Sequence, residues 1–89
     1  MEKKFMSIEF FFAGGCSACA RARQALRETA ESTGQVTWEE IDIAKNPNRA
    51  VDVGVMSTPA LAIDGSLVFK SVPTPSELRT AIIARIGKG

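Results

Sequence analysis

An apolar segment that ends in a glycine pair and continues directly as a helical pattern limits this chain to a small set of folds. Residues 5–12 are nearly all apolar and do not alternate with polar residues, which is typical of a central strand covered on both faces. After Gly14 and Gly15, apolar residues recur every three or four positions until Gly34, which predicts an amphipathic helix ending at that glycine. A buried strand followed at once by such a helix indicates an α/β protein.

The next segment adds a strand and a short helix. Residues 36–43 alternate between apolar and polar positions and include Trp38, which predicts a second strand. Asn46 and Pro47 are expected to be the N-cap and the first residue of a short helix that ends before Gly54.

A hairpin and a final helix complete the predicted elements. Residues 59–63 and 67–69 flank the sequence Asp-Gly-Ser, a tight-turn signal that predicts two antiparallel strands. Thr74 and Glu77 have the spacing of a capping box around a proline at the first helical position, and an apolar stripe follows. The order of elements is therefore β-α-β-α-β-β-α.

This order predicts a four-stranded mixed sheet. The first two strands are parallel and joined by a right-handed helical crossover, the last two form the antiparallel hairpin, and helices must cover both faces of strands this apolar. No internal repeat or linker interrupts the pattern, so residues 1–89 are expected to form a single domain.

The composition of the chain narrows its function. Its 89 residues are 45% hydrophobic and carry a net charge of +1, with basic and acidic residues mixed along the sequence. Neither the basic surface that nucleic acid requires nor an apolar segment that crosses a membrane is expected. The amino terminus, with its lysines and its apolar stretch before Cys16, is similar to a lipoprotein signal, but the stretch is short and contains Glu9, so we expect a cytoplasmic protein.

The two cysteines of the chain, Cys16 and Cys19, lie three positions apart where the strand gives way to the helix. The turn places Cys16 at the helix start, where free backbone N–H groups and the helix dipole favour a thiolate. Cys19 follows nearly one turn later, within reach of Cys16 and directed toward the core. One accessible and one sheltered sulfur is the asymmetry that thiol–disulfide exchange requires. Arg21 and Arg23 could help to hold a thiolate or a substrate, but residues on the solvated face of a helix are more often just solvated, so neither is included in the predicted site.

A metal site and a packing role are the alternatives for this pair. Two thiolates suit Cu(I), and small metallochaperones carry C-x-x-C between a first strand and a helix, so a Cu(I) or Zn(II) carrier, or a docking module, stays open as an alternative. His is absent, which removes the commonest nitrogen ligand and the commonest general base. Because the later elements differ from those of metallochaperones, the redox interpretation is preferred, and no bound metal or cofactor is expected.

The sequence resembles the thioredoxin-like superfamily, and within it the small archaeal and bacterial thioredoxins often called glutaredoxin-like. The segments that carry the resemblance are "FFFAGGCSAC", "EEIDI" and "GVMSTPALAIDGSLVFKSVPTPSEL", which together span nearly the whole chain. The resemblance implies a thioredoxin fold in which a cis-proline, Pro59, faces the cysteine pair. It also implies that the backbone of Thr58, next to Pro59, binds an extended substrate segment as a short added strand.

Several positions depart from typical members of this superfamily. Ser17 and Ala18 separate the cysteines, in place of the Gly-Pro of thioredoxins or the Pro-Tyr of glutaredoxins. Phe10 occupies the position at which many thioredoxins carry a buried Asp, and Glu9 could accept the proton of Cys19 only if a different register turned it inward. Glutaredoxins usually place a glycine pair before the last helix to bind glutathione, whereas this chain has Ser71-Val72-Pro73-Thr74, which argues against glutathione use.

The sequence thus predicts a monomeric cytoplasmic thiol–disulfide oxidoreductase, serving electron transport and cell redox homeostasis. Cys16 is the expected nucleophile and Cys19 the resolving thiol, with protein disulfides as substrates. A separate enzyme of the thioredoxin-reductase kind is expected to supply electrons, because the chain has no glycine-rich nucleotide motif.

Overall fold

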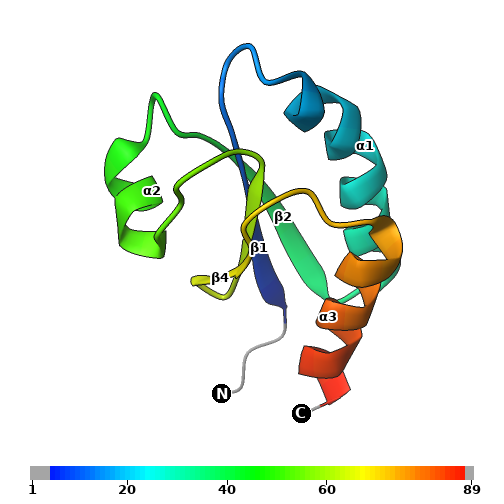
Figure 1. The fold of residues 1–89 in the computed structure, drawn as a ribbon. Helices are drawn as coiled ribbons and strands as arrows, with labels where there is room; N and C mark the ends of the chain where they lie inside the picture. The colour runs from blue at the N-terminus through cyan, green and yellow to red at the C-terminus, as the bar shows by residue number, and fades with distance from the viewer. Residues whose placement is uncertain (1–4, 88–89) are drawn as a thin grey trace.

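The computed structural model describes residues 5–87, which form a sheet with helices on both faces (Figure 1). No helix within this part of the chain has the length and apolar character needed to cross a bilayer. The order of elements and the mixed sheet confirm the predicted fold class. The elements are β1 (Met6–Phe12), α1 (Ser17–Ser32), β2 (Val36–Asp42), α2 (Pro47–Val53), β3 (Ala60–Ile63), β4 (Ser66–Phe69) and α3 (Pro75–Gly87).

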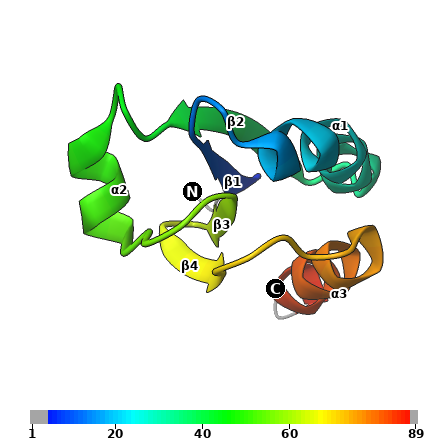
Figure 2. The ribbon, with the colours of Figure 1, turned by 45° about the horizontal axis from the view of Figure 1, so that its top comes forward.

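Strand β1 occupies the middle of the sheet, whose order is β2-β1-β3-β4. It pairs in parallel with β2 on one side and antiparallel with β3 on the other, as Figure 2 shows. The hairpin then adds β4 antiparallel to β3. Because β1 has a strand on each side, the loop at its carboxyl end starts from a fixed position.

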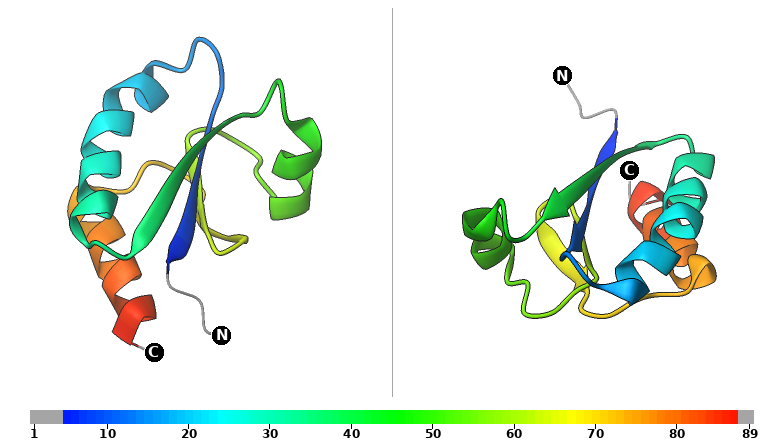
Figure 3. Two further views of the ribbon diagram at one scale, coloured as in Figure 1. Left: turned by 180° about the vertical axis from the view of Figure 1, so that it is seen from behind. Right: turned by 90° about the horizontal axis from the view of Figure 1, so that it is seen from above.

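The two faces of the sheet bury alternate residues of β1. Helices α1 and α3 cover one face and α2 covers the other, with the sheet between them (Figure 3). Ile8 and Phe10 pack toward α1 and α3, whereas Phe11 packs into the smaller cluster on the α2 face. All three side chains are fully buried, which confirms that residues 5–12 contain a strand covered on both faces.

The predicted turn and the predicted capping box are both present. Asp64 and Gly65 have φ values of 52° and 85°, the left-handed conformations that a two-residue hairpin turn requires. The backbone N–H of Thr74 donates to the Glu77 carboxylate at 2.9 Å, and the N–H of Glu77 donates to the Thr74 hydroxyl oxygen at 3.0 Å. The start of α3 is thus fixed by reciprocal hydrogen bonds.

The start of α2 differs in one detail from the prediction. Asn46 is the N-cap and Pro47 follows it, but the Asn46 side chain makes no capping hydrogen bond. Its Nδ2 instead donates to the carbonyl of Asp42 at 3.2 Å. The side chain therefore reaches back to the end of β2 rather than forward to the helix.

Candidate active site

The site begins where β1 ends, because the turn after this strand delivers Cys16 to the start of α1. Gly15 has a φ of 81°, a backbone conformation that glycine adopts without strain. Cys16 follows as the extended N-cap residue, and its Sγ accepts the backbone N–H of Cys19 at 3.1 Å. Sulfur thus takes the place of the oxygen that usually caps a helix, among N–H groups that favour negative charge.

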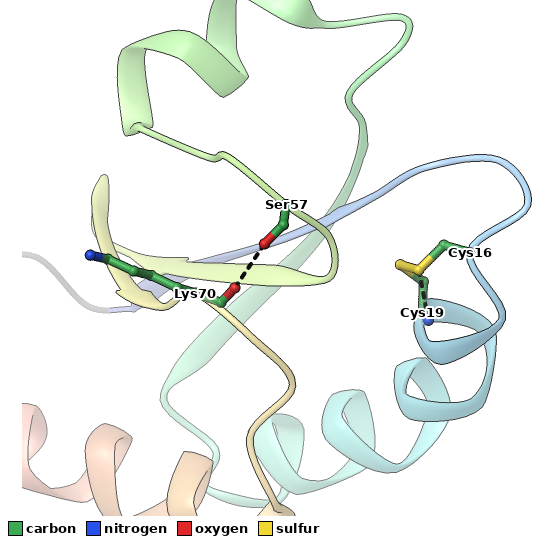
Figure 4. Close-up of a disulfide and its surroundings, with 4 residues drawn as sticks. All are labelled: Cys16, Cys19, Ser57 and Lys70. Atoms are coloured by element: carbon green, nitrogen blue, oxygen red, sulfur yellow. Dashed lines mark hydrogen bonds between the residues drawn. A yellow bond between two sulfur atoms is a disulfide. The ribbon is translucent and has the colours of Figure 1, made fainter.

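Cys16 and Cys19 form a disulfide at the amino-terminal end of α1 (Figure 4). Their Cα atoms are 5.2 Å apart, within the range that the bond allows. Cys16 is half-buried, whereas Cys19 is 4% exposed and packs in the core between the sheet and α1. A reagent approaching from solvent therefore reaches Cys16 more easily.

A pocket of about 180 Å³ lies beside the disulfide. Its wall is mainly apolar, with aromatic rings from β1, the glycine loop and the first turns of α1. Arg23 also lines it, and its side chain is 52% exposed, which agrees with the solvated position that the sequence indicated. The lining residues are Phe10, Phe12, Ala13, Gly14, Gly15, Cys16, Cys19, Ala20 and Arg23.

Strand β2 supplies a carboxylate next to this pocket. Glu40 lies opposite Phe10 in the parallel register, and its Oε1 is 3.7 Å from a guanidinium nitrogen of Arg23. The indole N–H of Trp38 donates to the same carboxylate at 3.0 Å, and the Trp38 ring stacks on Phe10 at 5.5 Å. Glu40 is therefore held from two sides on the cysteine side of the sheet.

Glu9, the other carboxylate considered near the cysteines, lies on the opposite face of the sheet. It is 5% exposed, and its two oxygens accept hydrogen bonds of 2.7 Å each from Arg49 of α2. Hydrogen bonding and charge attraction from Glu9 raise the pKa of Arg49 above its ordinary value. The register thus does not turn Glu9 toward Cys19.

The segment before β3 comes to the same end of the sheet as the cysteines. Phe11 pairs with Ala60, so Pro59 stands one step further, at the level of Phe12 in the pocket wall. The Thr58–Pro59 bond is cis, as the resemblance implied; Pro59 is buried and Thr58 half-buried. Just upstream, the Ser57 hydroxyl donates to the carbonyl of Lys70 at 3.2 Å, which ties this segment to the end of β4 (Figure 4).

Comparison with known proteins agrees with this geometry. The thioredoxin domain family model matches residues 6–83. The chain belongs to the thioredoxin family. A thioredoxin from Methanocaldococcus jannaschii is 33% identical over 82 residues, which cover 91% of this chain and 96% of that protein.

Solved thioredoxin structures share the fold. A variant of the Halobacterium salinarum thioredoxin superposes with a TM-score of 0.78 at 24% identity, covering 89% of this chain and 73% of that one. Thioredoxin-2 of a malaria parasite superposes with a TM-score of 0.76 at 20% identity, covering 94% of this chain and 86% of that one. The family, the fold and the Cys16–Cys19 pair together make the chain a thiol–disulfide oxidoreductase.

The sequence interpretation did not place two features of this thioredoxin in the site. Arg23 lies four residues after Cys19, a spacing that places both on one side of a helix, and this signal was available in the sequence. The pairing of Arg49 with Glu9 joins residues 40 positions apart, for which the sequence carries no local signal.

Proposed function

We propose that Cys16 attacks a disulfide of a protein substrate and that Cys19 then releases the reduced substrate. The Cys16 thiolate forms a mixed disulfide with one substrate sulfur, and the other substrate sulfur leaves as a thiolate that takes up a proton. Cys19 loses its proton and attacks Cys16, so the Cys16–Cys19 bond forms and the second substrate thiol departs. Two electrons pass from the cysteine pair to the substrate.

The observation that carries this proposal is the contact between the Cys16 sulfur and the backbone N–H of Cys19, at 3.1 Å. A sulfur that accepts an N–H at the start of a helix is stabilised as a thiolate, which is the attacking species. The difference in burial between the two cysteines supports the same order of attack.

We place the substrate at the disulfide end of the sheet. Thr58 and Pro59 are the proposed binding residues, because the register brings their segment level with the pocket wall. An extended segment of a substrate protein would pair with the Thr58 backbone as a short added strand. This arrangement needs only peptide groups from the substrate, so it accepts many sequences.

We infer that residues 1–89 act as one monomeric domain in the cytoplasm, and that a separate reductase returns electrons to the oxidised pair. The relatives named thioredoxin support this general scheme.

Single substitutions at the two cysteines test the order of attack. Cys16→Ser should abolish reduction of insulin disulfides and form no covalent adduct, because the attacking thiolate is gone. Cys19→Ser should still attack but should not resolve, so its mixed disulfide should persist on a non-reducing gel and disappear with dithiothreitol. Adducts formed by Cys16→Ser instead would reverse the two roles.

A metal carrier would give a different result. Either substitution would then remove one of two equivalent ligands and weaken metal binding to a similar degree, without trapping a partner. Measuring Cu and Zn per protein after purification under reducing conditions completes the test. Stoichiometric metal in the wild type, together with no trapped partner, would overturn the proposed function.

A further inference from the structure

We propose that Arg23 supplies the positive charge that favours the thiolate form of Cys19 in the step that releases the substrate, and that Glu40 positions Arg23 for this role. The inference rests on the proposed function. It adds a residue to the resolving step, which needs a deprotonated Cys19 although this thiol is 4% exposed.

The helix brings the two residues together. Cys19 and Arg23 are four positions apart within α1, a separation at which side chains lie about 5–6 Å apart at Cβ. Both residues line the pocket beside the disulfide. Arg23 is the one charged side chain among the described residues that line this pocket. Helical side chains point back toward the preceding turn, which directs Arg23 toward Cys19, and a nearby cation favours the charged form of a thiol.

Glu40 restrains the guanidinium from the strand side. Its Oε1 is 3.7 Å from Arg23, and its other oxygen accepts the Trp38 indole N–H at 3.0 Å. A long side chain that is half exposed would otherwise sample many rotamers. Anchored by Trp38, the carboxylate attracts the Arg23 guanidinium toward the pocket, although this side chain is 52% exposed.

The other charged groups around this pocket are engaged elsewhere. On β2, Asp42 Oδ1 accepts the N–H of Ala44 at 2.9 Å within its own turn. On β1, Glu9 lies on the far face, bonded to Arg49. Helix α3 contributes Leu78 and Ile82 to the core cluster that contains Cys19, so the residues it turns inward are apolar.

The resolving step can be isolated with 5,5′-dithiobis(2-nitrobenzoate), an aromatic disulfide. The reduced protein should release one coloured thiolate when Cys16 attacks the reagent and a second when Cys19 attacks the resulting mixed disulfide. Stopped-flow absorbance separates the two phases. The pH dependence of the second phase reports the ionisation of Cys19.

Arg23→Gln should slow the second phase about three- to tenfold at neutral pH and move its pH profile to higher pH, because the charge that favours the thiolate is gone. Arg23→Lys keeps the charge and should restore most of the rate. In the wild type, 1 M salt should move the profile in the same direction as Arg23→Gln. The first phase serves as an internal reference in each variant.

Arg27 provides the matched control, since it lies one turn further along α1 and does not line the pocket. Its guanidinium is 3.2 Å from the carboxylate of Glu31. Arg27→Gln should leave both phases unchanged. An unshifted profile in Arg23→Gln, or an equal shift in Arg23→Lys, would overturn the role of the Arg23 charge. A wild type that releases a single thiolate and forms no internal disulfide would instead contradict the proposed function.

Discussion

Arg49 of α2 donates two hydrogen bonds of 2.7 Å to the carboxylate of Glu9 in the central strand. The Glu9 side chain is 7% exposed and that of Arg49 is 43% exposed, so the pair reaches from the α2 surface to the sheet. A bidentate contact of this kind fixes the orientation of both groups. It holds α2 against a face of the sheet whose apolar cluster is the smaller of the two.

Removing Arg49 should therefore destabilise the fold. Arg49→Met leaves the Glu9 carboxylate buried without its partner, which should lower the free energy of unfolding by roughly 2–3 kcal/mol. The cost stays below that of a fully enclosed pair because Arg49 is partly exposed. Urea unfolding measures this difference without adding salt.

A double variant distinguishes the stabilisation that the ion pair provides from the cost of leaving the Glu9 carboxylate buried without a partner. Glu9→Met with Arg49→Met removes both groups, and we expect most of the lost stability to return, because an apolar pair of similar volume often substitutes well. Arg27→Met, which breaks the exposed pair with Glu31, should cost less than about 0.5 kcal/mol. Equal losses at Arg27 and Arg49 would contradict the anchoring role of Arg49.

The capping box of α3 gives a second prediction. Thr74→Ala removes the acceptor for the Glu77 N–H and should destabilise the protein by about 1 kcal/mol. Thr80→Ala is the control, because Thr80 is exposed within the same helix and alanine is the better helix former. Thermal or urea unfolding of the oxidised protein should show a loss at Thr74 and none at Thr80.

The adjacent glycines before Cys16 should respond differently to alanine. Gly15 has a φ of 81°, so Gly15→Ala should cost about 1 kcal/mol and should shift Cys16 from its position at the helix start. Gly14 lies outside the left-handed region, and a Cβ there meets nothing within 4 Å. Gly14→Ala should therefore keep both stability and insulin reduction, and a loss as large as that of Gly15→Ala would refute this distinction.

The cysteines of the reduced protein should differ in reactivity. Cys16 is half-buried at the helix start and Cys19 is 4% exposed, so iodoacetamide should modify Cys16 first. The rate at Cys16 should rise with pH around a midpoint below the ~8.5 of a free thiol. Peptide mapping by mass spectrometry after a short exposure identifies the modified residue, and faster modification of Cys19 would count against Cys16 as the nucleophile.

Local patterns in the sequence predicted most of the fold. The glycine pair, the Asp-Gly turn and the Thr74 capping box each fix a conformation through residues close in sequence, and the structure confirms all three. The Asn46 side chain is an exception: its Nδ2 donates to the carbonyl of Asp42, which also accepts the backbone N–H groups of Lys45 and Asn46. Local propensity favours Asn at the N-cap but does not show whether its side chain accepts from the helix N–H groups or donates to the preceding turn.

The site was only partly predictable. The cysteine spacing marked the redox pair, and the resemblance supplied Pro59, since X–Pro bonds are rarely cis and composition does not reveal them. Arg23 was interpreted as solvated because helix periodicity does not show that Glu40 of β2 lies across from it. No partner was predicted for Glu9, because Arg49 is 40 positions away in the sequence and reaches Glu9 only through the packing of α2 on the sheet.

The sheet order leaves one side of β2 and one side of β4 without a partner strand among residues 5–87. Such edges can recruit strands from other molecules and so lead to aggregation. Strand β4 has only 4 residues, and β2 carries Glu39, Glu40 and Asp42 within its 7 residues. A second copy that aligned β2 with itself would bring these carboxylates together, so the charge on this strand opposes pairing between copies through this edge.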